Sequence, residues 1–265
     1  METIYIKSKR NSLIPTTIKC SNSCGGLIML IHGFKSERSE DKRFDLIEDE
    51  LSKYGAYSIA MDFPGCNESK ESTMEYSLNN CLDDMESCYQ YMISNYEIDT
   101  NNVSLVGYSL GGRLIAIFAS RHPEIKNLVF WAATCHNGFE EGRFIDQEIA
   151  PLKLEAQEKG YCTFYDIFGD RYFPLPKSFL DEMESINIEE CLQQFKGNAL
   201  IIQGNKDITI NPNNGQLIDD NLVSAASKQL LIMDGTNHGF GIWDGRLQDS
   251  IFLTDKTIEF LKNNL

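Results

Sequence analysis

The stretch NVSLVGYSLGGRLIAIFASRH, residues 102–122, combines a short apolar run, a glycine-rich turn and an apolar helical pattern. Residues 103–106 are mostly apolar or β-branched, which predicts a buried strand. Apolar side chains then recur at helical spacing from residue 110, and Pro123 ends the pattern because it lacks a backbone donor and constrains the residue before it. The stretch therefore predicts a strand and a helix joined by a very short turn.

Ser109 stands in that turn, with Gly107 and Gly111 two residues away on either side. A G-x-S-x-G turn between a strand and a helix is a nucleophile elbow, which is too tight for side chains at the two glycines. The turn lifts the serine hydroxyl clear of the sheet and aims the amides of the new helix at the reaction centre. The pattern alone also arises by chance, so the strand before it and the helix after it carry the prediction.

The length and charge of the chain limit its class. A chain of 265 residues, 42% of them hydrophobic, can bury the core of one large α/β domain, and we expect a single domain over residues 1–265. The net charge of −15 argues against nucleic acid and anionic membrane surfaces as partners, and slightly favours neutral small-molecule substrates. No apolar run reaches the length of a membrane span.

The N-terminal residues lack the apolar core of a secretory signal, so we expect a cytoplasmic protein. Eight cysteines are scattered without a disulfide framework, which agrees with reduced thiols in that compartment. Cys20 and Cys24 could form half of a metal site, but no second pair with suitable spacing completes it. We therefore expect neither a metal nor a cofactor.

Strands and helices alternate along the chain. The segments 3–9 and 13–19 alternate apolar and polar residues, which predicts an antiparallel hairpin. Apolar runs typical of buried strands follow at residues 27–31, 57–63, 103–106, 128–132, 199–202 and 230–233. Helical patterns lie at residues 37–53, 76–96, 110–122, 213–223 and 247–261. This order predicts an α/β fold with a mainly parallel sheet, helices on both faces and an N-terminal antiparallel hairpin.

The alternation is interrupted at about residues 137–190. This segment is rich in Gly, Phe, Tyr and Pro and has short helical pieces, such as residues 148–158. Its size and composition predict a small lid inserted between two strands, and not a separate domain.

Four polar features follow predicted strands: His32-Gly33-Phe34, Ser109, Asp207 and His238. The carboxyl ends of parallel strands line one edge of a sheet, where ligands bind, so we expect these residues to lie close together. A serine needs a base to become a nucleophile. We expect His238 to accept the Ser109 proton and Asp207 to hold the imidazole in the required tautomer.

Each of these roles has an alternative. Asp219 or Asp220 could replace Asp207, although both lie within or after the following helix. Among the other histidines, residue 32 is expected to be structural and His122 to interact with a helix C-terminus. His136 could approach the site, but it comes before Asp207 in the chain. This argues against it as the base, because the histidine follows the acid in the order Ser, Asp, His.

The chain resembles the α/β-hydrolases over essentially its whole length. The resemblance is carried by HGF at residues 32–34, DFPGCNES at 62–69, GYSLGG at 107–112, QGNKD at 203–207 and GTNHGF at 235–240. It is most similar to cytoplasmic esterases of the cinnamoyl and feruloyl type and to their serine-aminopeptidase-like relatives. One departure is GCNES at 65–69, where the family has G-x-G-x-S; Asn67 tolerates a left-handed backbone almost as glycine does.

The oxyanion of the reaction needs two N–H donors. One is expected from the backbone of Leu110, the residue after the nucleophile, and the resemblance implies that the second is the backbone N–H of Phe34. Aromatic residues of the lid region are candidates for the substrate pocket, with simple packing as an equal alternative. These candidates are Trp131, Phe139, Phe144, Tyr161, Tyr165, Phe168 and Tyr172, with His136 beside them.

The resemblance and the residues together predict a serine hydrolase that cleaves small-molecule carboxylic esters with small or aromatic acyl groups. Its acyl-enzyme would form on Ser109. Alternatives on the same triad are a thioesterase, an aminopeptidase-type acyl hydrolase and a hydrolase of carbon–carbon bonds. A catalytically silent binding protein is a further alternative, although such proteins usually lose the serine, the acid or the histidine, and this chain has all three.

Overall fold

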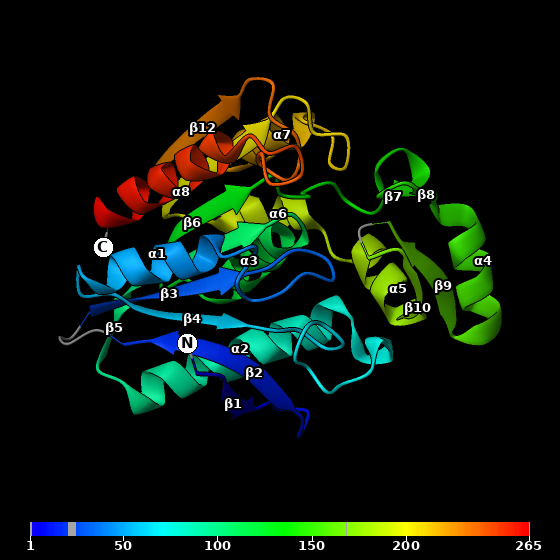
Figure 1. Cartoon of the computed structure of the whole chain (residues 1–265), viewed down its shortest axis with the longest axis horizontal. Coiled ribbons are helices and arrows are strands. Elements are labelled where there is room, and N and C mark those ends of the chain that lie inside the picture. Colours follow the sequence, from blue (N-terminus) through cyan, green and yellow to red (C-terminus); the bar gives the residue numbers. More distant parts are fainter. Residues whose placement is uncertain (1, 21–24, 168, 265) are drawn as a thin grey trace.

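The computed structural model describes residues 2–20, 25–167 and 169–264, and most of its strands lie in one central sheet (Figure 1). The strands of this sheet are β1 Ile4–Lys7, β2 Leu13–Lys19, β3 Gly25–Ile31, β4 Tyr57–Met61, β5 Ile98–Tyr108, β6 Ile125–Trp131, β11 Asn198–Gly204 and β12 Ser227–Met233. Within the described residues their order is β1-β2-β4-β3-β5-β6-β11-β12. β2 pairs antiparallel with β1 and β4, and every other pair is parallel. The predicted mainly parallel sheet with its N-terminal hairpin is confirmed.

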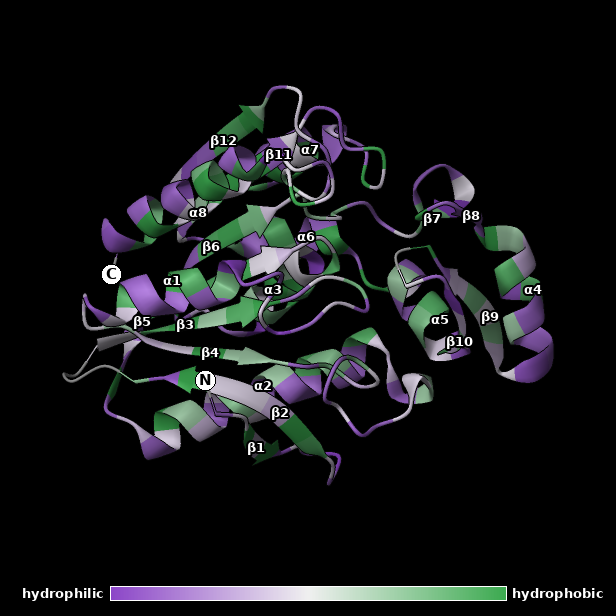
Figure 2. Ribbon diagram, in the orientation of Figure 1, coloured by the Kyte–Doolittle hydropathy of each residue, from purple (hydrophilic) through white to green (hydrophobic). Residues whose placement is uncertain are grey.

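Helices cover both faces of the sheet. They are α1 Arg43–Ser52, α2 Leu78–Asn95, α3 Leu110–Arg121, α6 Ile188–Gln194, α7 Asn213–Asn221 and α8 Leu247–Lys262. α1 and α8 bury apolar side chains with one face of the sheet, and α2, α3, α6 and α7 do so with the other. The central strands are therefore hydrophobic along most of their length (Figure 2). Each fully buried large side chain stabilises the fold by about 1.5–3 kcal/mol relative to leaving it exposed.

The first predicted helix begins later than expected, at Arg43 and not at Glu37. Glu40, Asp41 and Lys42 have φ values of 45°, 54° and 67°, which are left-handed and cannot continue a right-handed helix. The Glu40 carboxylate accepts hydrogen bonds from the Gly33 N–H and the Ser36 hydroxyl. These contacts with residues earlier in the same loop hold the turn, and helical periodicity does not reveal them.

The segment predicted as a lid forms its own small group of elements between β6 and β11. These are the 3₁₀ turn η2 Glu140–Gly142, β7 Arg143–Phe144, β8 Gln147–Glu148, α4 Ile149–Lys159, β9 Tyr161–Asp166, β10 Arg171–Pro176 and α5 Lys177–Ser185. β9 and β10 form an antiparallel pair, and the group lies to one side of the sheet, at the right of Figure 1. α6, which begins at Ile188, packs against α3 and α7. We call residues 137–187 the inserted segment.

The described cysteines are free thiols. Cys20 is exposed, and its proposed partner Cys24 lies outside the described residues. Among residues 2–20, 25–167 and 169–264, no group of three or more His, Cys, Asp or Glu is arranged to hold a metal ion. In the same residues no helix is long and apolar enough to cross a membrane.

Candidate active site

Ser109 occupies a strained turn between β5 and α3. Its φ of 53° and ψ of −117° lie where non-glycine residues are rare, and such strain persists only when the surroundings fix it. A Cβ on Gly107 would lie 2.5 Å from the Gly111 carbonyl oxygen, and one on Gly111 would lie 2.2 Å from the Ile31 carbonyl oxygen. Both glycines are therefore required by close backbone contacts. The predicted elbow is present in the backbone.

Asp207 and His238 follow β11 and β12 and lie beside Ser109. His238 Nε2 is 3.1 Å from the Ser109 Oγ, and His238 Nδ1 is 2.7 Å from Asp207 Oδ2. The three side chains are buried, with 8%, 5% and 4% of the surface exposed for Ser109, Asp207 and His238. Buried hydrogen bonds of this kind are protected from competition by water. The structure therefore brings the three predicted residues into one continuous chain of hydrogen bonds.

The Asp207 carboxylate is fixed by its own loop. Its Oδ1 accepts the backbone N–H groups of Thr209 and Ile210 at 2.9 and 2.8 Å, and its Oδ2 accepts the Gln203 amide at 3.2 Å. Four hydrogen bonds, including that of the histidine, hold the acid in one orientation. The two alternative acids, Asp219 and Asp220, lie instead on α7, where they contact Lys228 and Gln216.

The two expected oxyanion donors border the same cavity as Ser109. Leu110 is the first residue of α3, and the N–H groups of the first helical turn have no acceptor within their own helix. Phe34 lies on the loop after β3, beside Gly33. The amide of Gly33 is already occupied, because it donates to Glu40 Oε2 at 3.2 Å. The backbone N–H of Phe34, the next amide of this loop, stays our prediction for the second donor.

His32 stabilises this loop through hydrogen bonds of its ring. Burial lowers the pKa of His32 to about 4, so the ring is neutral at physiological pH. Its Nδ1 lies 2.7 Å from the Gly33 carbonyl oxygen, and its Nε2 accepts the Phe63 N–H at 3.3 Å. These contacts are consistent with a proton on Nδ1. The structural role predicted for His32 agrees with its position.

Burial also raises the pKa of Glu40 to about 7, in spite of the Arg43 guanidinium 3.4 Å away. This carboxyl borders the cavity and accepts the Gly33 amide. The loop that carries Phe34 is therefore held by a group that titrates near neutral pH.

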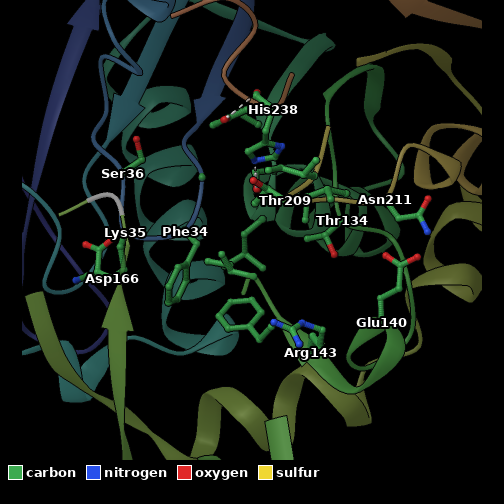
Figure 3. Close-up of a pocket in the computed structure, with 18 of the residues that line it drawn as sticks. Phe34, Lys35, Ser36, Thr134, Glu140, Arg143, Asp166, Thr209, Asn211 and His238 are labelled. Atoms are coloured by element: carbon green, nitrogen blue, oxygen red, sulfur yellow. Dashed lines mark hydrogen bonds between the residues drawn. The ribbon is translucent and has the colours of Figure 1, made fainter. Parts of the chain in front are cut away.

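A cavity of about 520 Å³ opens at Ser109 between the sheet edge and the inserted segment (Figure 3). Its apolar wall combines residues of both regions: Phe34, Leu110, Phe139, Phe144, Ile145 and Met183. The Phe34 ring meets the Phe144 ring edge-on at 4.9 Å, a favourable aromatic geometry. The volume suits a small molecule. Two of the predicted pocket residues, Phe139 and Phe144, therefore line this cavity.

Other predicted pocket residues lie elsewhere. Trp131 is fully buried on the opposite face of the sheet, because side chains alternate along β6; it contacts Phe44 and donates to the Thr257 hydroxyl. His136 is half-buried and does not border the cavity. Tyr165 points its hydroxyl at Asp170. Phe168 lies outside the described residues.

The remaining tyrosines of the prediction, Tyr161 and Tyr172, also do not border the cavity. Tyr172 is 71% exposed, and its ring packs on Tyr165 across the β9–β10 pair. The period of two along these short strands turns half of the aromatic residues outward. Composition alone does not show which half that is.

Several lining residues were not predicted from the sequence. Trp243 lies five residues after His238, and their rings are 5.7 Å apart. The charged lining residues are Lys35, Glu40, Asp41, Glu140, Glu141, Arg143, Asp166 and Arg171. Lys35 and Asp166 lie together on one side of the cavity (Figure 3). Lys35 donates to the Gly65 carbonyl, and burial lowers its pKa. The position of Lys35 directly after the HGF motif was the one feature of the sequence that could have identified it as a lining residue.

Comparison with known proteins gives the class of this fold. The model of the alpha/beta hydrolase fold family matches residues 26–158, half of the chain. The chain belongs to this family.

The solved structures to which the chain is similar include Est1E from Butyrivibrio proteoclasticus with ferulic acid bound. That structure has a TM-score of 0.76, 16% identity and a coverage of 98% of both chains. An esterase from Exiguobacterium antarcticum has a TM-score of 0.70, 14% identity and a coverage of 98% of this chain and 100% of its own. These likenesses show the fold. A repeats-in-toxin protein of Vibrio cholerae is 27% identical over 105 residues, 40% of this chain, and the chain spans 2% of that toxin's length.

Proposed function

We propose that the protein is a serine hydrolase that cleaves carboxylic esters through an acyl-enzyme on Ser109. The observation that carries the proposal is the buried hydrogen-bond chain from Ser109 through His238 to Asp207, at the mouth of a small-molecule cavity. In this reaction the Ser109 Oγ attacks the ester carbonyl carbon while His238 Nε2 takes the hydroxyl proton. The collapse of the tetrahedral intermediate breaks the bond to the alcohol oxygen, which receives that proton from His238.

Water completes the cycle. His238 removes a proton from a water molecule, whose oxygen attacks the acyl carbon. The acid leaves, and the proton returns to the Ser109 oxygen. Asp207 stabilises the imidazolium that forms in both halves of the reaction, and its three further hydrogen bonds keep the carboxylate in place. The N–H groups of Phe34 and Leu110 stabilise the oxyanion, and the loss of one such donor typically costs about 3–4 kcal/mol of transition-state stabilisation.

The acyl group is proposed to be small or aromatic. Support comes from the Phe34, Phe139 and Phe144 rings in the wall of a 520 Å³ cavity, and from the fold likeness to a structure that holds ferulic acid. We further propose that the inserted segment acts as a lid, since it supplies much of the wall opposite Ser109. A cytoplasmic location remains our prediction, in agreement with the free thiols of the described cysteines.

The first test is labelling with a small fluorophosphonate, which reacts only with an activated serine. We expect stoichiometric labelling of Ser109 and none in Ser109→Ala. A protein that does not react would be a binding protein on the same scaffold.

The second test is a substrate panel of p-nitrophenyl esters of increasing chain length, methyl ferulate, a thioester and an aminoacyl anilide. We expect the highest kcat/KM for an ester with a short or aryl acyl group. Preference for the thioester or the anilide would keep the mechanism and replace the proposed substrate class.

A further inference from the structure

Arg113 is a buried cation one helical turn beyond Ser109 on α3. The side chain is 0% exposed although it is among the largest and most polar that a protein contains. Burial lowers its pKa but leaves it charged at any physiological pH. Arginine is almost never fully buried unless it is paired. A residue in this position therefore needs an explanation beyond filling space.

The partners of Arg113 are backbone carbonyls at the two ends of the inserted segment. Nη1 donates to the His136 carbonyl at 2.7 Å, and Nη2 donates to the Met183 and Ile186 carbonyls at 2.8 and 3.1 Å. Within the described residues no carboxylate lies within 4 Å of its nitrogen atoms. The dipoles of these carbonyls, and the negative end of α5 in particular, therefore stabilise the buried guanidinium charge, as a carboxylate would otherwise do.

These carbonyls mark the two places where the inserted segment joins the body. His136 directly precedes the inserted segment, five residues after the end of β6, and Met183 and Ile186 lie at the end of α5, where the chain returns. The two stems also bind each other, because the Gly138 N–H donates to the Met183 carbonyl at 3.1 Å and the Asn137 side chain accepts the Ile188 N–H. Arg113 attaches this joint to the helix that begins at Ser109.

The joint is continuous with the wall of the cavity. Gly138, Phe139 and Met183 border the cavity that contains Ser109, and Met183 also supplies one of the carbonyls that Arg113 holds. A rotation of the stems would therefore move the wall relative to the Ser109 hydroxyl. Five donors on a rigid planar group suit the fixing of several carbonyls at once, whereas the ammonium group of lysine is a point charge without this planar geometry.

We infer that Arg113 is a positioning residue, which fixes both stems of the inserted segment to the nucleophile helix and thereby sets the acyl selectivity of the pocket. The part of this inference that concerns acyl selectivity rests on the proposed function, whereas the part that concerns the attachment of the stems does not. It differs from an ordinary core role in one respect. A residue that only fills the core would lower the activity toward all substrates equally, through the folded fraction.

The test compares Arg113→Met, an unbranched apolar side chain without the donors, with Arg113→Lys, which keeps the charge. Arg121→Met is the matched control, because Arg121 is exposed at the end of the same helix. In Arg113→Met we expect the ratio of kcat/KM for an aryl ester to that for p-nitrophenyl acetate to fall on the order of tenfold, as misplacement of a binding wall does. Arg113→Lys should be intermediate, and Arg121→Met unchanged.

Hydrogen exchange, measured on the same proteins, gives a result that needs no substrate. Amides of residues 136–140 and 183–188 should exchange faster in Arg113→Met than in the wild type, while those of β5 and β6 should not. If the wild-type protein hydrolyses no ester, the proposed function is wrong, but hydrogen exchange still tests the structural part of the inference. The inference is wrong if a folded Arg113→Met protein keeps both the wild-type ester selectivity and the wild-type exchange rates. It is also wrong if kcat/KM falls equally for all esters and amides exchange faster throughout the protein. If Arg113→Met does not fold, the same two criteria apply to Arg113→Lys.

Discussion

The carboxyl edge of the sheet and the inserted segment border one cavity but are built differently. At the sheet edge, Ser109, Asp207 and His238 are joined by hydrogen bonds of 2.7 and 3.1 Å, and the turn around Ser109 is fixed by backbone contacts. The inserted segment contributes Phe139 and Phe144, which contact other aromatic rings without directional bonds.

This difference predicts how the two regions tolerate change. Hydrogen bonds fail when one partner is removed, because the group left behind is buried and unpaired. Apolar walls repack, and hydrophobic substitutions of similar size are tolerated. We therefore expect substitutions at the sheet edge to abolish turnover, and those in the inserted segment to change which substrate is preferred.

The largest effect is expected from Ser109→Ala and His238→Ala. Each should lower kcat by roughly 10⁵–10⁶-fold, and the double variant should be scarcely worse, because the residues act as one unit. Steady-state kinetics on p-nitrophenyl acetate measures this. Ser120→Ala is the control, since that hydroxyl donates to the Ile117 carbonyl within the same helix. Additive losses would show that Ser109 and His238 do not work together.

Asp207→Asn should rank next, with a loss of about 10⁴-fold in kcat, because the amide no longer enforces the required tautomer of His238. Asp219→Asn is the control, since Asp219 pairs with Lys228 on the surface. Kinetics on the same ester decides between them. A severe loss of kcat in Asp219→Asn, together with a mild loss in Asp207→Asn, would mean that the acid has been misassigned.

An intermediate effect is expected from the wall of the inserted segment. Phe144→Ala should lower kcat/KM for an aryl ester by about tenfold, because a ring contact in the pocket is lost, and leave that for an acetyl ester within about twofold. Tyr172→Ala, on an exposed ring of the same segment, should change neither value. Thermal unfolding of each variant separates selectivity from stability. Equal losses on both esters would contradict the division between the two regions.

The smallest effect on turnover is expected from Glu40, whose main effect is on the pH dependence of stability. The pKa of Glu40 rises from 4.5 to about 7 on folding, so between these values the folded state holds a proton that the unfolded state has lost. Its contribution to stability is therefore full below about pH 4.5 and is lost as the pH rises to about 7. The slope is about 1.4 kcal/mol per pH unit. Glu40→Gln should remove this slope from urea-unfolding curves recorded between pH 5 and 8.

Glu48 provides the comparison for that measurement. It is as buried as Glu40, and burial raises its pKa to about 8, so the same loss should extend about one pH unit higher. Glu48 is on the buried face of α1 and accepts a hydrogen bond from the Ser58 hydroxyl, away from the cavity. Only the Glu40 change should also affect kcat/KM, because Glu40 accepts the amide of Gly33 in the loop that holds Phe34. A free energy of unfolding with the same pH slope in Glu40→Gln and wild type would contradict this account.

The sequence by itself determined the body of the fold and the residues that meet at the carboxyl edge of the sheet. Buried strands differ from surface helices in periodicity, and the tight turn at Ser109 requires glycines that can be recognised in the letters. Asp207 and His238 follow predicted parallel strands, whose carboxyl ends must meet at one edge. These inferences need only local patterns and the rule of strand connection.

Only the tertiary structure decided the cavity wall, the start of α1 and the contacts of Arg113. Phe144 faces the cavity and Trp131 does not, because strand pairing and packing fix the direction of each side chain. Glu40 turns the chain before α1 through a hydrogen bond from Gly33, seven residues away, and Arg113 donates to carbonyls 23 and 70 residues away. A side chain's partners across such separations depend on the folded arrangement of the whole chain. No local sequence pattern encodes them.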